Sequence, residues 1–248
     1  MSIPVLIPAR NESRHIGETL EALSRQTENT EPIVVVNGNT DSTPDIARNM
    51  GALVLESSEG KMPALQVGMR HLGKRVLESL LILDADSKPL FKGWASRLST
   101  NLASLPKEDP AIVWGPYFFH GEINLVVGAF YTATSVQVSW VDRDKAKPRT
   151  VRGGNIGLKI NNEDLFEELL GLENYWPRED VAIFDTAVKH DANKKVVFHP
   201  EAWVQTSGYR SADILKKVIR ERRHPSKITD DSYAREAPLG SKPYFSKD

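Results

Sequence analysis

Short apolar runs alternate with helical patterns over the first hundred residues. Four segments are rich in Leu or β-branched residues and bounded by turn residues, as buried strands are: residues 3–7, 33–36, 53–55 and 80–83. Between the first two, Ile16, Leu20 and Leu23 share one face of a helix. This alternation predicts an α/β fold with a mostly parallel central sheet and helices on both faces.

Start and stop signals define further elements. Thr43-Pro44-Asp45 combines a cap, a proline at the first helical position and an acid in the first turn, and Gly51 stops the helix. From Trp114 to Arg152 the pattern is less regular and predicts a mixed insertion with a helix near residues 126–138. The remaining pattern predicts helices at residues 162–170, 181–190 and 212–223, and short strands at 196–198 and 203–205. We find no internal repeat, low-complexity stretch or linker, so one domain is expected.

Composition excludes several classes of protein. Lys and Arg total 32 against 33 Asp and Glu, which argues against a protein that coats nucleic acid. The absence of Cys excludes disulfides, thiolate metal sites and cysteine nucleophiles, and suits a reducing cytoplasm. No signal-peptide pattern opens the chain, and the weakly charged residues 123–141 are too polar for a membrane span. A cytoplasmic protein is therefore expected.

Two carboxylates follow the fourth apolar run, in Leu83-Asp84-Ala85-Asp86. Parallel sheets bind ligands outside the carboxyl ends of their strands. Hard oxygen ligands at that place suit Mg²⁺ or Mn²⁺, which would bridge to a nucleotide diphosphate and neutralise the leaving group. The alternative is an ordinary turn and helix cap, because Asp and Ser cap helices well.

Polar clusters follow the other three strands as well. Arg10, Asn11 and Glu12 precede a helix, whose N-terminus can hold a base or a phosphate. Residues 37–41 offer amide and carboxylate groups suited to a pyrimidine edge, and Lys61 follows the third strand, where it can pair with a phosphate. Each cluster alone is explained as a turn or a cap. Four consecutive strand ends of this kind favour a sugar-nucleotide site.

The segments IPARNE, VVNGNTDST, EGKMPALQVGM and LILDADSKP, in this order, resemble family 2 glycosyltransferases of the GT-A fold. RGGNIGLK and REDVAIFDTAVKHDANKKVVFHPEAWVQTSGYR resemble the acceptor-side half of that family, so the resemblance spans residues 3–210. It implies a single GT-A domain over residues 1–248. Within it we expect a nucleotide-sugar half at 1–110, an acceptor half at 111–210, and a basic helix and tail at 211–248.

The resemblance also implies roles for individual residues. It assigns Asp86 as the direct ligand of a divalent metal, Mn²⁺ or Mg²⁺, and Asp84 to the ribose and the water shell of the metal. It assigns Asp180 as the general base of an inverting transfer; without the family context, Glu179 and Asp180 are simply acids at a helix start. Nucleotide-sugar contacts fall to Pro8, Arg10, Glu12, Asn37, Asn39, Asp41, Lys61, Asp84, Ala85, Asp86 and Arg210. The acceptor side comprises Gly154, Asn155, Trp176, Glu179 and Asp180.

The chain departs from the family pattern at two places. Val36-Asn37 stands where many relatives have two aspartates, so the base of the donor, UDP- or GDP-sugar by expectation, stays open. The Gln-x-x-Arg-Trp element of processive members is absent, which favours a single transfer over polymerisation.

Two other classes of protein stay open. One is a nucleotidyltransferase acting on a sugar phosphate, which is disfavoured because residues 7–12 lack glycine. The other is a catalytically silent nucleotide-sugar binding module.

The sequence does not identify the acceptor or the function of the C-terminal segment. The predicted C-terminal helix is basic, which fits a solvated face, a clamp on the diphosphate, a peripheral site on an anionic membrane, or a phosphate-bearing acceptor such as DNA. Small molecules, lipid phosphates and modified DNA bases all present hydroxyl groups. The sequence makes no prediction of the oligomeric state.

Overall fold

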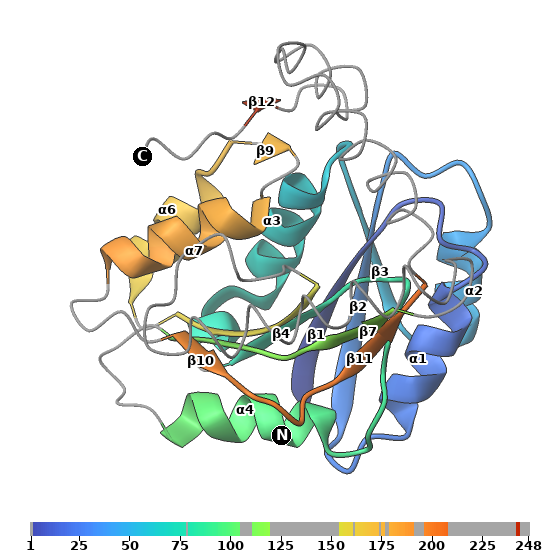
Figure 1. The fold of residues 1–248 in the computed structure, drawn as a ribbon. Coiled ribbons are helices and arrows are strands. Elements are labelled where there is room, and N and C mark those ends of the chain that lie inside the picture. The colour runs from blue at the N-terminus through green and yellow to red at the C-terminus, as the bar shows by residue number, and fades with distance from the viewer. Residues whose placement is uncertain are drawn as a thin grey trace, which may run out of the picture.

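The computed structural model of the protein (Figure 1) describes residues 2–77, 79–104, 111–119, 154–160, 162–173, 175–176, 179–190, 196–207 and 242–243. The helices expected at 126–138 and 212–223 lie outside the described residues, as do all but the first six residues of the insertion expected at 114–152.

A seven-stranded sheet forms the centre of the described part of the chain, in the order β10-β6-β8-β4-β1-β2-β3. Among these strands, β8 runs antiparallel to both its neighbours and all other pairs are parallel. The strands are β1 (Ile3–Ala9), β2 (Thr30–Asn37), β3 (Leu53–Ser57), β4 (Leu80–Leu83), β6 (Ala111–Trp114), β8 (Asn155–Lys159) and β10 (Val196–Phe198). The predicted mostly parallel sheet is confirmed, and it contains strands from both expected halves of the chain.

Helices cover both faces of the sheet (Figure 1). Alternation along β1 explains how: Val5 and Ile7 pack with the helices of one face, and Leu6 packs with those of the other. The first face is covered by α1 (Ile16–Ser24), α2 (Thr43–Asn49) and α4 (Trp94–Ser104). The second is covered by α3 (Lys61–Leu72), which leads into the short helix η1 (Gly73–Leu77), and by α6 (Glu163–Leu170) and α7 (Glu179–Lys189). The strands are therefore apolar on both sides, as strands buried between two helical layers are.

The predicted helix ends are largely confirmed. Gly51 has a φ of 81° and donates its N–H to Arg48 O at 3.0 Å, so it ends α2 in the left-handed conformation that glycine tolerates best. Asn162 caps α6 by accepting a hydrogen bond from the Leu165 N–H at 2.7 Å. The strand expected at 203–205 is observed one residue later, as β11 (Val204–Thr206).

A smaller three-stranded sheet lies beside the main one, in the order β5-β11-β7, with β5 at Ser87–Pro89 and β7 at Tyr117–Phe119. The turn at residues 84–86 leads from β4 directly into β5, not into a helix, so the alternative explanation of these acids as a helix cap is wrong. The antiparallel pairing of β5 with β11 places Thr206 opposite Ser87. A two-residue parallel pair joins β9 (Tyr175–Trp176) to β12 (Lys242–Pro243).

Candidate active site

The parallel strands β1, β2, β3 and β4 all end at one edge of the main sheet, and the polar segments singled out in the sequence follow these ends. Because β8 is antiparallel to β4, its first residue, Asn155, lies opposite Leu83 at the same edge. Gly154 therefore adjoins Asp84, although the two residues are far apart in the sequence. The topology brings the donor-side and acceptor-side motifs together.

One ammonium group joins the two sets of motifs. Lys61 Nζ lies 2.6 Å from Asp84 Oδ1 and 3.3 Å from Glu179 Oε1, so it connects the start of α3, the end of β4 and the start of α7. Burial alone would lower the pKa of Lys61, but Asp84, Glu179 and Asp180 outweigh it and raise that pKa above its ordinary value. Lys61 therefore remains charged and compensates a group of three acids.

Burial has the opposite effect on Glu179, whose side chain is 11% exposed. Desolvation raises the pKa of Glu179 to about 7, against the attraction of Lys61, and the neighbouring Asp180 adds to the rise. Asp180, the next residue of α7, is only partly buried. Of the two acids, Asp180 is thus the one better exposed to an incoming molecule.

Asp84 is held in place by its surroundings. Its N–H donates to Gly154 O at 3.1 Å, and Gly154 N–H in turn donates to the buried Tyr117 hydroxyl at 2.9 Å. A Cβ atom on Gly154 would lie 1.8 Å from Asp84 Oδ2, so only glycine allows the carboxylate its observed position. The position of Asp84 depends on a residue of the acceptor-side motif.

Asp86 is held by Ser207, which directly follows β11 within the last acceptor-side motif. Ser207 Oγ donates to Asp86 Oδ2 at 2.7 Å, and Ser207 N–H donates to Asp86 O at 3.2 Å. Within the described residues, no three side chains of acids or histidines are arranged so that together they could hold a metal ion. Asp84 and Asp86 nevertheless fit Mg²⁺ or Mn²⁺, because such ions are commonly held by one or two carboxylates together with phosphate oxygens of the substrate.

The loops after β1 and β2 are locked to each other. Asn11 N–H donates to Asn39 Oδ1 at 2.9 Å, and Asn11 Oδ1 accepts from Thr40 N–H at 2.8 Å. Asn11 has a φ of 53°, a left-handed conformation that asparagine tolerates better than most residues. Asn39, predicted to meet the nucleotide, is thus used to fix the shape of these loops.

Asp41 has a similar bracing role. Its carboxylate accepts from Ser13 N–H at 3.0 Å and from Thr43 N–H at 2.9 Å, so it serves the chain before α1 and the first residue of α2 together. Burial opposes ionisation, but the hydrogen bonds from Thr43 and Ser13 are stronger in sum and hold the pKa of Asp41 well below its ordinary value.

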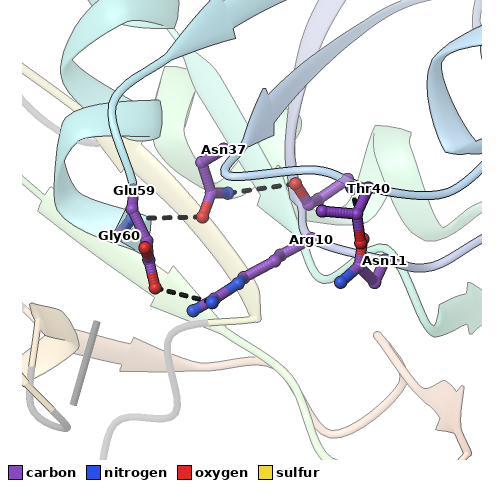
Figure 2. A network of polar contacts seen from close by, with 7 residues as sticks. Arg10, Asn11, Asn37, Thr40, Glu59 and Gly60 are labelled. Carbon is purple, nitrogen blue, oxygen red and sulfur yellow. Dashed lines mark hydrogen bonds and ion pairs between the residues drawn. The ribbon is translucent and has the colours of Figure 1, made fainter. Parts of the chain in front are cut away.

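Asn37 and Arg10 are also engaged within the protein (Figure 2). The buried Asn37 side chain donates from Nδ2 to Ala9 O at 3.0 Å and accepts at Oδ1 from Gly60 N–H at 3.2 Å. Gly60 has a φ of 122°, which favours glycine at the start of α3. Arg10 forms an ion pair with Glu59 at 2.6 Å between Nη2 and Oε1.

The remaining predicted residues are placed as follows. Pro8 is buried within β1. Glu12 is buried and donates its backbone N–H to Thr43 Oγ1 at 2.8 Å, and Ala85 is buried with its carbonyl oxygen accepting from Thr19 Oγ1 at 2.8 Å. Trp176 belongs to β9, and Arg210 lies outside the described residues.

Asn155, predicted on the acceptor side, is fully buried. Its Oδ1 accepts from Trp94 Nε1 at 2.8 Å, and its Nδ2 donates to Ala202 O at 2.8 Å and Pro116 O at 3.3 Å. These contacts connect β8 with α4 and with the segments that lead into β7 and β11. In this arrangement Asn155 supports the site from within.

Sequence reasoning missed Glu59, Tyr117 and Ser207 as members of the site. Glu59 directly precedes Gly60 in the segment that follows the third strand, and Ser207 belongs to the last acceptor-side motif. Both residues therefore lie within motifs that could have indicated a place in the site. Tyr117 had none, because its contact with Gly154 N–H arises only from the fold.

Two solved structures share this fold. A mannosyltransferase from Pyrobaculum calidifontis, in complex with GDP-Man and Mn²⁺, superposes with a TM-score of 0.59 at 20% identity over 86% of this chain and 60% of its own. Glucosyl-3-phosphoglycerate synthase from Mycobacterium tuberculosis, in complex with Mn²⁺, UDP and glucosyl-3-phosphoglycerate, superposes with a TM-score of 0.57 at 17% identity over 86% of this chain and 74% of its own. The fold is therefore that of the GT-A glycosyltransferases.

The family model described as Glycosyl transferase family 2 matches residues 5–153, and the chain belongs to this family. Two curated relatives are 4,4'-diaponeurosporenoate glycosyltransferases. The one from Staphylococcus haemolyticus is 37% identical over 93 residues, which cover 34% of this chain and 24% of the relative. The one from Staphylococcus aureus is 35% identical over 77 residues, 28% of this chain and 20% of the relative. The matched segments thus span about a quarter or less of these relatives.

No helix within the described ranges has both the length and the apolar character needed to cross a membrane.

Proposed function

We propose that the protein transfers one sugar from a nucleotide-diphosphate sugar to a hydroxyl group of an acceptor, with inversion at the anomeric carbon. The observation that carries this proposal is the contact of Lys61 with both Asp84 and Glu179. It brings the donor-side carboxylates to the N-terminus of α7, where Asp180 lies. A leaving diphosphate and an acceptor hydroxyl can then meet at one edge of the sheet.

The donor side consists of Asp86, Asp84 and Lys61. A divalent ion held by Asp86, with Asp84 in its water shell, would stabilise the negative charge that develops on the leaving diphosphate. Lys61 holds Asp84 in place and supplies a positive charge to the same region. Ser207 orients the carboxylate of Asp86 through its hydroxyl group. The Mn²⁺ complexes of the two structural neighbours support this assignment.

The acceptor side depends on Asp180. Its carboxylate takes the proton of the acceptor hydroxyl while the acceptor oxygen bonds to the anomeric carbon and the bond from that carbon to the diphosphate oxygen breaks. The nucleoside diphosphate leaves with the electron pair of the broken bond. The neighbouring Glu179 is buried against Lys61 and is therefore placed to position α7 relative to the donor side.

The test is donor turnover by purified variants. Asp86→Ala and Asp180→Asn are expected to lower turnover of the nucleotide sugar by about a hundredfold or more while keeping the melting temperature near that of the wild type. Asp164→Asn, a charge change on the exposed first turn of α6, serves as the matched control and is expected to retain activity. Full activity in either site variant removes that residue from the mechanism.

Two further measurements distinguish this proposal from a nucleotidyltransferase and from a nucleotide-sugar binding module. Release of pyrophosphate from a nucleoside triphosphate in the presence of a sugar phosphate would instead identify a nucleotidyltransferase. Tight binding of nucleotide sugars without turnover, across small-molecule, lipid-phosphate and DNA acceptors, would identify a binding module.

A further inference from the structure

The end of β2 has lost the carboxylate that many family members carry there. Asn37 replaces it, and both ends of its amide form hydrogen bonds within the protein: Nδ2 donates to Ala9 O, and Oδ1 accepts from Gly60 N–H. The side chain is 4% exposed. In this conformation Asn37 therefore links the ends of β1 and β2 to the start of α3 and offers little surface to a nucleobase.

A different carboxylate lies at the same edge, on the loop between β3 and α3. The Glu59 side chain crosses directly over Gly38, where a Cβ atom would lie only 3.2 Å from Glu59 Cγ. Its Oε1 is 2.6 Å from Arg10 Nη2, and the two side chains are 22% and 41% exposed. Figure 2 shows the pair beside Asn37, bridging the ends of the loops that follow β1 and β3. A carboxylate and a guanidinium are thus presented side by side.

We propose that Glu59 and Arg10 are the residues that read the base of the donor, and that they select guanine. Guanine presents an acceptor oxygen at position 6 next to two donors, the N1–H and the 2-amino group. A guanidinium donates to the first, and a carboxylate accepts from the other two in a bidentate contact. The charge pattern of the pair therefore matches the guanine edge in order.

Other bases match the pair less well. Uracil offers one donor between two acceptor oxygens, so one of these oxygens would face the carboxylate. Cytosine and adenine each offer one amino donor, and both have an unprotonated ring nitrogen where guanine has N1–H. A site built to bind two donors discriminates strongly against bases that lack one of them, since a polar group is then left unpaired.

This inference rests on the proposed function, because it assumes that a nucleoside diphosphate binds with its phosphates near Lys61 and Asp84. Lys61 follows Glu59 by two positions at the start of α3, so one short segment would contact the base through Glu59 and the phosphate side through Lys61. Guanosine-containing donors are then the preferred substrate class.

The experiment is calorimetric titration of the whole protein with GDP, IDP, UDP, CDP and ADP in the presence of Mn²⁺. IDP is guanosine diphosphate without the 2-amino group, so the comparison of GDP with IDP isolates one donor. GDP is expected to bind the wild type roughly tenfold more tightly than IDP, and more tightly still than UDP. In Glu59→Gln the advantage of GDP over IDP is expected to disappear, because the amide keeps only one acceptor oxygen and its NH₂ group opposes the other donor of the base.

Glu56→Gln is the matched control, since it makes the same change on β3 at a side chain that is 78% exposed. It is expected to keep the preference for GDP. Equal or tighter binding of UDP by the wild type, or an unchanged GDP preference in Glu59→Gln, would overturn the inference and leave the proposed function standing. Failure of every nucleoside diphosphate to bind would overturn both.

Discussion

At the scale of single residues, the position of Asp84 depends on groups from distant parts of the chain. Lys61 Nζ contacts one carboxylate oxygen, and the backbone of Gly154 bounds the other. Tyr117 holds Gly154 through its hydroxyl group. Asp84 is therefore pre-oriented before any ligand arrives, which is how binding sites avoid the entropic cost of ordering their side chains.

Gly154→Ala tests this pre-orientation. The new methyl group would lie 1.8 Å from Asp84 Oδ2, so the carboxylate must move, and we expect donor turnover to fall by about a hundredfold. Gly17→Ala is the control, because its nearest contact is 3.7 Å and α1 accepts alanine readily. Turnover by Gly154→Ala equal to that of the wild type would show that the position of Asp84 is not essential.

The sequence predicted which residues lie at this edge of the sheet, but it did not predict which groups they contact. The order of the strands along the chain indicated that Arg10, Asn37, Lys61 and Asp84 lie together, because parallel strands end at one edge. It gave no indication that Arg10 pairs with Glu59 or that the amide of Asn37 is used within the protein. Such pairings depend on side-chain directions across strands, which hydrophobic periodicity does not encode.

At the scale of elements, one carboxylate ties together the segments that precede α1 and α2. Neither His15 nor Ser42, the residues at the N-cap positions, makes a side-chain capping bond. Asp41 supplies the acceptor instead, to Ser13 N–H and Thr43 N–H. The loops at this edge of the sheet are therefore held by hydrogen bonds within the protein.

Asp41→Asn is expected to lower the free energy of unfolding by about 2 kcal/mol at pH 7, since charge-assisted hydrogen bonds are lost. The folded-state pKa of Asp41 is depressed, so the unfolded chain takes up the proton first as the pH falls. The stabilisation is thus fully present above the unfolded pKa of about 4 and is lost progressively below it.

Urea unfolding of the wild type and of Asp41→Asn, in steps of roughly one pH unit from about pH 3 to about pH 7, measures the difference in their free energies of unfolding. The difference in free energy of unfolding between the two proteins is expected to decrease as the pH falls. Asp45→Asn, at a side chain that is 75% exposed in the same region, is the control and should change little. A difference in free energy of unfolding that does not change with pH would contradict the stabilisation of these segments by the ionised Asp41.

Element prediction from the sequence succeeded where an apolar run marks the strand. The four strands β1, β2, β3 and β4 are observed near the expected positions, and the three-residue strand β10 lies at the expected residues 196–198. The strands β5 and β7 were not expected, because Ser87–Pro89 contains no apolar run and Tyr117–Phe119 falls in the segment with an irregular pattern. These short strands matter for the site, since β5 and β11 bring Ser207 to Asp86.

At the scale of the whole molecule, β8 joins the two expected halves of the chain by pairing with β4 on one side and β6 on the other. Asn155, its first residue, adds hydrogen bonds to Trp94 and to the carbonyls of Pro116 and Ala202. Both sheets and one helical layer therefore converge on one buried amide beneath the site.

Asn155→Ala is expected to lower the free energy of unfolding by about 3 kcal/mol, because it leaves the Trp94 indole N–H and the Ala202 carbonyl without the side chain that they bond in a buried place. Asn162→Ala removes the cap of α6 and should cost about 1 kcal/mol, which makes it the control for the same chemical change. Equilibrium unfolding in urea gives both values, and equal losses would argue against a central role for Asn155.

The central claim, a metal-dependent nucleotide-sugar site built on Asp86, is tested most directly by melting temperature. Wild type and Asp86→Ala are heated with uridine, guanosine, cytidine and thymidine diphosphates and their sugars, with and without Mn²⁺. We predict that at least one nucleotide raises the melting temperature of the wild type by roughly 5–10 °C at a hundredfold excess over Kd, only with Mn²⁺ present, and that Asp86→Ala loses the rise. No rise with any nucleotide, or an equal rise in Asp86→Ala, would contradict the account.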